Sequence, residues 1–63
     1  MKQQILKLEN EKIAIITFEV EPVQLAIFEK TDEIESVEFS TALEALNYVD
    51  SKFKIIGTKI NKL

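Results

Sequence analysis

The fold is decided by the stretch FSTALEALNYVDSKFKIIGT, residues 39–58, which predicts a capped helix that leads into a strand. Thr41 and Glu44 have the spacing of a capping box, in which each side chain bonds the backbone amide of the other residue. Ser40 is a rival N-cap one residue earlier. Beyond the cap, apolar residues recur at helical spacing, and they are Ala42, Ala45, Leu46, Val49 and Phe53. We therefore predict a helix from Thr41 to Lys52 with this stripe against the core.

A strand is expected after the helix, at residues 55–60. Alternation places Ile56, Thr58 and Ile60 on one side of it. Gly57 is the only glycine in the chain, and an isolated glycine in a strand indicates a bulge or a tight contact with a neighbouring side chain. The tail, residues 61–63, is expected to fray.

Residues 39–58 also resemble a pattern in small domains of unknown function. Those domains carry Ala-Leu-Asn-Tyr on a helix, then Gly-Trp, then an apolar strand that closes a small antiparallel sheet. Here Ala45-Leu46-Asn47-Tyr48 matches the helix, while Lys52 and Phe53 stand where the glycine and the tryptophan would be. The resemblance covers about a third of the chain. It implies a sheet with one helix, and it supplies no activity.

Two strands are predicted at the start of the chain. Gln3 to Leu8 is the first, and Asn10 in the following turn tolerates the left-handed conformation that a tight loop needs. Lys12 to Val20 is the second and the clearest, because it is rich in β-branched and aromatic residues. On one face of this strand, Ala14, Ile16, Phe18 and Val20 are expected to be fully buried. The other is apolar at Ile13 and Ile15 and acidic at its end, which indicates a central strand or a start covered by a partner.

The segment after Pro22 allows two structures. Val23 to Glu29 is either a third strand or part of a helix that starts at Pro22 and runs to Lys30. We favour the strand, because a helix would leave the preceding strand with fewer neighbours. Thr31 to Ser36 is expected to be a polar, acidic loop, and Ser36 to Phe39 a short strand before the helix.

These elements predict an α+β fold. We expect an antiparallel β-sheet of three to five strands with one α-helix, about 41–52, packed on one face, in the order β-β-β-(β)-α-β. Sixty-three residues leave room for a single domain, 1–63. The predicted core consists of Ile16, Phe18, Val20, Leu25, Ile27, Phe39, Ala42, Leu46, Val49, Phe53 and Ile56.

The composition suggests self-association. The chain has no cysteine and no histidine, so no disulfide or zinc site can cross-link it, yet 46% of its residues are hydrophobic. A small apolar domain without such cross-links is expected to be a homo-oligomer, with a dimer favoured. The longest apolar runs fall far short of the roughly 20 residues of a membrane span, and Met1 begins no recognisable targeting signal. We therefore expect a cytoplasmic protein that does not cross a membrane.

Charge is segregated along the chain. All eleven acids lie within residues 9–50, and six of the eight lysines lie outside that segment. Such acids ordinarily solvate the outer face of a small domain. The sharper hypothesis is an acidic surface that meets a basic patch on another protein. Its candidate partner-binding residues are Glu19, Glu21, Glu29, Asp32, Glu33, Glu35 and Glu38.

Catalysis and cofactor binding are not expected. Without histidine or cysteine, the chain lacks the commonest bases, nucleophiles and transition-metal ligands. A single glycine cannot build a phosphate-cradling loop, and Asp32 to Glu35 lacks the spacing of a calcium loop. We therefore predict no catalytic residues, no cofactor and no metal site.

Three functions follow from these observations. The first is a non-catalytic protein-interaction module, such as a small regulator or inhibitor from a mobile element, that acts through the acidic surface. The second is a homo-oligomeric assembly subunit that uses exposed apolar residues of the Lys12 to Val20 strand. The third is a weak nucleic-acid binder, which is disfavoured because the net charge is −3 and no arginine is present. Its candidate residues are Lys52, Lys54, Lys59 and Lys62.

Overall fold

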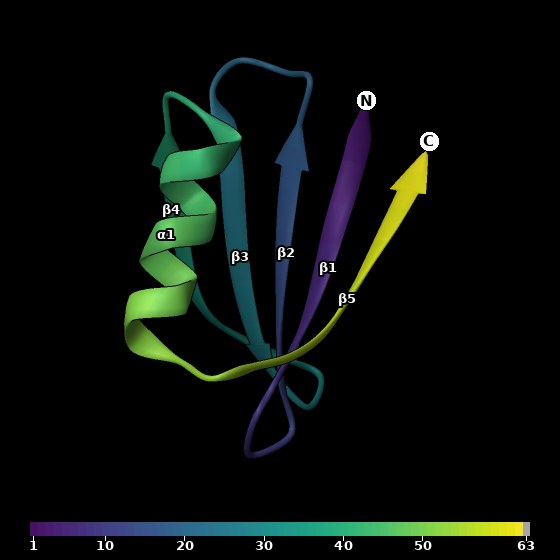
Figure 1. Ribbon diagram of the computed structural model, residues 1–63, viewed down its shortest axis with the longest axis vertical. Coiled ribbons are helices and arrows are strands. Elements are labelled where there is room, and N and C mark those ends of the chain that lie inside the picture. The colour runs from purple at the N-terminus through teal and green to yellow at the C-terminus, as the bar shows by residue number, and fades with distance from the viewer. Residues whose placement is uncertain (63) are drawn as a thin grey trace.

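The computed structural model describes the backbone of residues 1–62 and the side chains of residues 1–61. Within these residues, five antiparallel strands form one sheet, and one helix packs across a face of it (Figure 1). The elements in chain order are β1 (Lys2–Leu8), β2 (Lys12–Phe18), β3 (Val23–Glu29), β4 (Asp32–Phe39), α1 (Ala42–Lys52) and β5 (Ile55–Lys62). The predicted α+β class is confirmed, but four complete strands precede the helix.

The chain makes a meander and then crosses the sheet. Strands β1 to β4 follow one another as antiparallel neighbours, and α1 carries the chain from the β4 edge back to the opposite edge. There β5 pairs with β1, so the sheet order is β4-β3-β2-β1-β5. Lys2 lies opposite Lys62 in this pairing, and the N- and C-terminal ends of the described chain lie side by side (Figure 1).

The core lies between α1 and the face of β2, β3 and β4 on which the helix packs. Alternation along each strand directs every second side chain to that face. The buried side chains are Leu6, Leu8, Ala14, Ile16, Val23, Leu25 and Ile27 from the sheet, with Ala45 and Val49 from the helix. Burial of so many aliphatic groups is the main favourable term in the folding free energy.

The helix begins and ends as its sequence predicts. Thr41 is the N-cap, and its hydroxyl accepts a hydrogen bond of 3.2 Å from the amide of Glu44. The Thr41 hydroxyl also donates to the Glu44 carboxylate at 3.2 Å, which replaces the reciprocal amide bond of an ideal capping box. At the other end, the amide of Phe53 donates to the carbonyl of Val49 at 2.9 Å. Phe53 is extended, so the chain leaves α1 directly toward β5 without a glycine cap.

Strand β4 corrects the prediction of an acidic loop at residues 31–36. Asp32 already pairs with Glu29, and the ladder continues to Phe39. Acidic residues are tolerated in this strand because β4 is at the edge of the sheet, where most of its side chains remain in water. The alternative of a helix between Pro22 and Lys30 was wrong, and the favoured strand, Val23 to Glu29, is confirmed.

Two predicted core residues are exposed. Val20 is 36% exposed, because β2 ends at Phe18 and Glu19 adopts a positive φ of 60° that starts a loop. Ile56 is 54% exposed, because the β1–β5 register shifts beside it and Ile55 packs on the core instead. Of the predicted core residues, Ile16, Leu25, Ile27 and Val49 are fully buried, and Phe18, Phe39, Ala42, Leu46 and Phe53 are partly buried.

Two buried residues of β1 are absent from the predicted core. Leu6 and Leu8 are each 1% exposed, because β1 is an interior strand rather than an edge. The predicted bulge near Gly57 is confirmed by the register shift, and a Cβ at Gly57 would lie 3.6 Å from the Cβ of Lys7. The predicted fraying is wrong for Asn61 and Lys62, whose backbone belongs to β5, and Leu63 lies outside the described residues.

We expect Leu6→Ala to lower the free energy of unfolding by roughly 2–5 kcal/mol, because it removes a fully buried aliphatic group and leaves a cavity in its place. Leu43→Ala is the matched control, since Leu43 is 65% exposed on the helix and should change stability little. Urea unfolding followed by circular dichroism measures both variants. Equal stabilities would contradict the placement of β1 in the core.

We expect Glu11→Gly to stabilise the protein by about 1 kcal/mol, because a side chain in the left-handed region is strained. The pairing of Leu8 with Lys12 leaves a three-residue loop, in which Asn10 and Glu11 have φ angles of 62° and 61°. Glycine adopts this left-handed region without the steric cost of a side chain. Glu9→Gly removes the same charge from the same loop and is the control. A melting temperature that rises no more for Glu11→Gly than for Glu9→Gly would refute the strain at Glu11.

Candidate interaction surfaces

The structure divides the seven predicted partner-binding acids between three places. Glu19 and Glu21 lie in the loop between β2 and β3, and Glu29 ends β3 at the opposite end of the sheet (Figure 1). The remaining four acids are all in β4, and they are Asp32, Glu33, Glu35 and Glu38. The acids that the structure gathers on one element are therefore those of the edge strand.

Three of the seven acids form ion pairs with lysines. Lys2 Nζ lies 3.0 Å from Glu19 Oε2, and Lys12 Nζ lies 3.5 Å from Glu29 Oε2. Lys52 Nζ lies 3.6 Å from Glu35 Oε2. Exposed pairs of this kind contribute only about 0–1 kcal/mol to stability. The acids outside these three pairs, Glu21, Asp32, Glu33 and Glu38, are all exposed.

The Glu35 pair belongs to a small network that joins the helix to the edge strand. The hydroxyl of Tyr48 donates to the Glu35 carboxylate, and Lys52 Nζ donates to the same hydroxyl at 2.9 Å. The ring of Tyr48 packs against Phe39 with centroids 5.4 Å apart, and Lys52 Nζ lies 4.7 Å from the Tyr48 centroid. Tyr48 is partly buried at the margin of the core, and its hydroxyl bonds to β4. Glu35 therefore has a structural partner within its own chain.

Within β4, alternation separates Glu33 and Glu38 from Glu35. Glu33 lies opposite Phe28 and Glu38 lies opposite Gln24, so both point to the sheet face away from the helix. Glu35 lies opposite Ile27, a core residue, and points to the helix side. Asp32 to Glu35 thus does not direct its carboxylates to one point. Among the described residues, no three acidic side chains converge as a metal site would need.

The face away from the helix, here called the open face, is partly apolar. Its central side chains are Ile5, Ile13, Ile15, Ala26 and Phe28, which alternate with the buried residues of the same strands. Ile13 is 38% exposed, and the other four are partly exposed. Of the two interpretations of β2, the central strand is confirmed. Ala26 and Phe28 of β3 continue its apolar surface.

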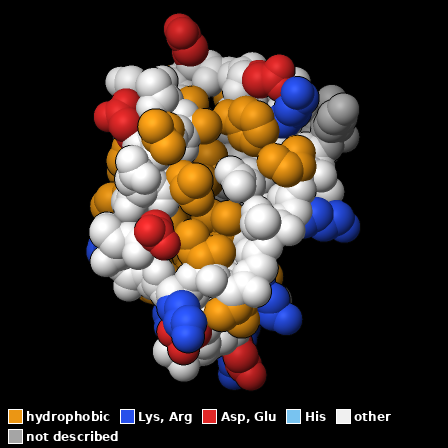
Figure 2. All heavy atoms as spheres, viewed as in Figure 1, with side chains coloured by type: hydrophobic (Ala, Val, Ile, Leu, Met, Phe, Trp, Pro, Cys, Tyr) orange, Lys and Arg blue, Asp and Glu red, His pale blue; other side chains and the backbone are white. Residues whose placement is uncertain are grey.

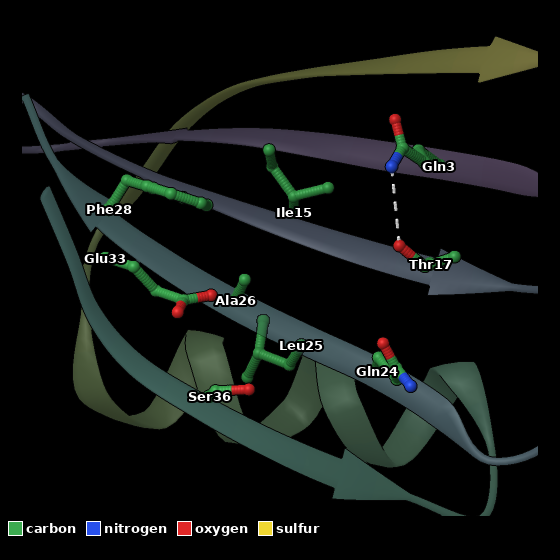
Figure 3. Close-up of a pocket in the computed structure, with 9 residues that line it drawn as sticks. All are labelled: Gln3, Ile15, Thr17, Gln24, Leu25, Ala26, Phe28, Glu33 and Ser36. Atoms are coloured by element: carbon green, nitrogen blue, oxygen red, sulfur yellow. Dashed lines mark hydrogen bonds between the residues drawn. The ribbon is translucent and has the colours of Figure 1, made fainter. Parts of the chain in front are cut away.

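A shallow hollow interrupts the open face. Figure 3 shows the residues around it, which come from the first four strands while the helix lies behind the sheet. The small side chain of Ala26 lies beside the bulkier Ile15 and Phe28, and Ser36 lies next to Ala26 on β4. Gln3 donates to Thr17 at 3.5 Å near the other end. Its volume is about 180 Å³, which is less than the roughly 300–1,000 Å³ of sites for drug-sized ligands. The hollow is suited to a side chain of a partner.

The helix side of the molecule also exposes hydrophobic atoms. Figure 2 shows them along the middle of this side, between α1 and β5. The helix contacts β2, β3 and β4 but leaves β5 largely uncovered, so Ile56 and Ile60 are both more than half exposed. The sequence predicted Ile56 as core, so this exposed strip was not expected.

The four candidate nucleic-acid lysines do not form one stripe. Lys52 is in the network with Tyr48 on the helix side, whereas Lys59 lies opposite Ile5 and points to the open face. Lys54 is exposed in the connection between α1 and β5, and the side chain of Lys62 lies outside the described residues. This placement does not favour a continuous track for phosphates.

Within residues 1–62, no helix is long and apolar enough to cross a bilayer. Searches against protein-family models, curated proteins and solved structures gave no match. The resemblance of residues 39–58 to small domains of unknown function therefore remains a prediction.

The network at Tyr48 is expected to make the stability of the fold depend on pH in the alkaline range. The hydrogen bond to the Tyr48 hydroxyl, with the Glu35 carboxylate nearby, raises the pKa of Lys52 above its ordinary value of 10.5. A raised lysine pKa stabilises the fold below the unfolded pKa, and the contribution is lost as the pH rises through the folded pKa. The difference in melting temperature between wild type and Lys52→Met should therefore narrow above pH 10.5. Lys54→Met controls for the loss of a neighbouring charge. If the difference in melting temperature between wild type and Lys52→Met persists above this pH, the contribution of Lys52 to the network at Tyr48 is contradicted.

Proposed function

We propose that this chain is a non-catalytic protein-interaction module whose acidic edge strand β4 binds a basic surface of another protein. The supporting observation is the concentration of four carboxylates within the eight residues of β4, at the outer edge of the sheet. Asp32, Glu33 and Glu38 are exposed there. A small regulator or inhibitor can act by binding its target through such a surface, without an active site.

The position of β4 favours this function over simple solvation. An edge strand presents backbone N–H and C=O groups on its outer side, and a partner strand can pair with them. Carboxylates on both sides of β4 would select a basic partner and speed its approach. The bulge at Ile34, where the β3–β4 register shifts, leaves this residue 48% exposed, and so adds an apolar contact to the same edge.

Assembly through the sheet is the second candidate function, and a different observation favours it. The open face exposes Ile13 and its apolar neighbours in the middle of the sheet. Isolated exposed aliphatic residues are ordinary, but a contiguous apolar patch with a polar rim is typical of an interaction site. This surface is developed in the next subsection.

The main proposal predicts that Glu33→Lys/Glu38→Lys loses the partner. Both residues are exposed and lie outside the three ion pairs, so the variant should keep the wild-type fold. Affinity capture from nuclease-treated lysate of the native host, read by mass spectrometry, would compare it with wild type. We expect one basic protein that wild type retains at low salt and releases as salt screens the contact.

Glu9→Lys/Glu11→Lys is the matched control, because it changes the net charge equally at the exposed turn between β1 and β2. This control should retain the partner. Equal loss in both variants would show a response to net charge alone, and equal retention would exclude β4 as the binding surface. Circular dichroism of each variant confirms that folding is unchanged.

A further inference from the structure

The open face has a charge gradient across its strands. The strand register places Gly57, Lys7, Ile13, Phe28 and Glu33 in one row from β5 to β4. The adjacent row contains Lys59, Ile5, Ile15, Ala26 and Ser36. Both rows are basic toward β5 and apolar in the middle, and Glu33 and Glu38 make the β4 side acidic. When one copy is turned by 180° about an axis parallel to the strands and laid on another, the basic β5 side of each copy therefore faces the acidic β4 side of the other.

We propose that a second copy of this chain packs on the open face, with a two-fold axis parallel to the strands and passing near β2. Such an axis places β4 of one copy over β5 of the other and β3 over β1. Glu33 then lies over the partner copy's β5 edge, beside Lys7 of that copy. A two-fold axis across the strands would instead stack β4 on β4, and like charges that face each other are destabilising. The charge gradient thus selects one of the two symmetric packings.

The shape of the open face supports the same packing. The hollow around Ala26 lies on β3, and the proposed axis places β1 of the second copy over it. In the row that contains Ala26, the β1 residue is Ile5. A branched side chain of one copy therefore enters the hollow of the other, and Ile13 and Ile15 stack near the axis on their own symmetry mates. Face-to-face sheets pack with interdigitated side chains in this manner, about 10 Å apart.

The area of the open face is at the low end for a specific interface. Five strands of about seven residues present a face of roughly 24 Å by 23 Å. Two such faces bury about 1,100 Å² in total, just below the range of about 1,200–2,000 Å² for stable specific complexes. We therefore expect a reversible dimer with a dissociation constant in the micromolar range. The inference concerns a surface other than the outer edge of β4, although Glu33 and Glu38 contribute to both.

A charge-swap experiment tests the packing. Variant A carries Glu33→Lys/Glu38→Lys, which makes both sides of the open face basic, and variant B carries Lys7→Glu/Lys59→Glu, which makes both sides acidic. Sedimentation equilibrium should show a wild-type dimer and an association about ten-fold or more weaker for each variant alone. An equimolar mixture of A and B should recover the dimer. Failure of the mixture to recover it would overturn the proposal.

Ala26→Phe tests the shape independently of charge. This substitution fills the hollow on an exposed face, where an aromatic residue suits a strand, and it should abolish the dimer. A wild-type protein that stays monomeric at about 1 mM, an Ala26→Phe protein that dimerises normally, or wild-type species larger than a dimer would each refute the two-fold packing. Ala26→Phe keeps every acid of β4, so it should still capture the basic partner. Loss of the dimer and loss of the partner are thereby distinguished.

Discussion

One eleven-residue helix has to cover a five-stranded sheet, and it cannot do so. Such a helix is roughly 16 Å long and about 10 Å wide, whereas the sheet is roughly 24 Å across. Coverage is therefore limited to one face and mainly to β2, β3 and β4. The buried aliphatic residues lie on that face. The other face is either exposed to water or covered by another molecule. The exposed apolar surfaces of this protein follow from that limit.

The two proposed surfaces are linked through β4. Glu35 is bonded to Tyr48 and Lys52, so it fixes the edge strand to the helix, while Glu33 and Glu38 face the other way. A second copy on the open face would cover Glu33 and Glu38, which are also the residues proposed to meet a basic partner. The two interactions would then exclude one another. Free monomer would be the form that binds the partner, and self-association would lower its concentration by mass action.

Local sequence signals predicted the elements well where burial is strong. The cap at Thr41 and the apolar stripe of the helix are confirmed, because each depends on contacts within a few residues. The strand at Val23 to Glu29 is also confirmed. The acidic segment of β4 was assigned to a loop because an edge strand needs few apolar residues to pair with its neighbour. The exposure of Ile56 follows from a register shift between distant strands, which alternation cannot reveal. Ala26 and Phe28 carried a usable signal, since they broke the expected polar alternation of β3 and thereby marked the open face.

The pairing of β1 with β5 has a consequence for chain connectivity. Because Lys2 lies opposite Lys62, the start of β1 and the end of β5 lie at one corner of the sheet. Proteins with adjacent termini tolerate circular permutation and insertion into a loop of another protein. This fold can therefore interrupt a host chain without separating the two cut ends, and a short peptide can join its own termini.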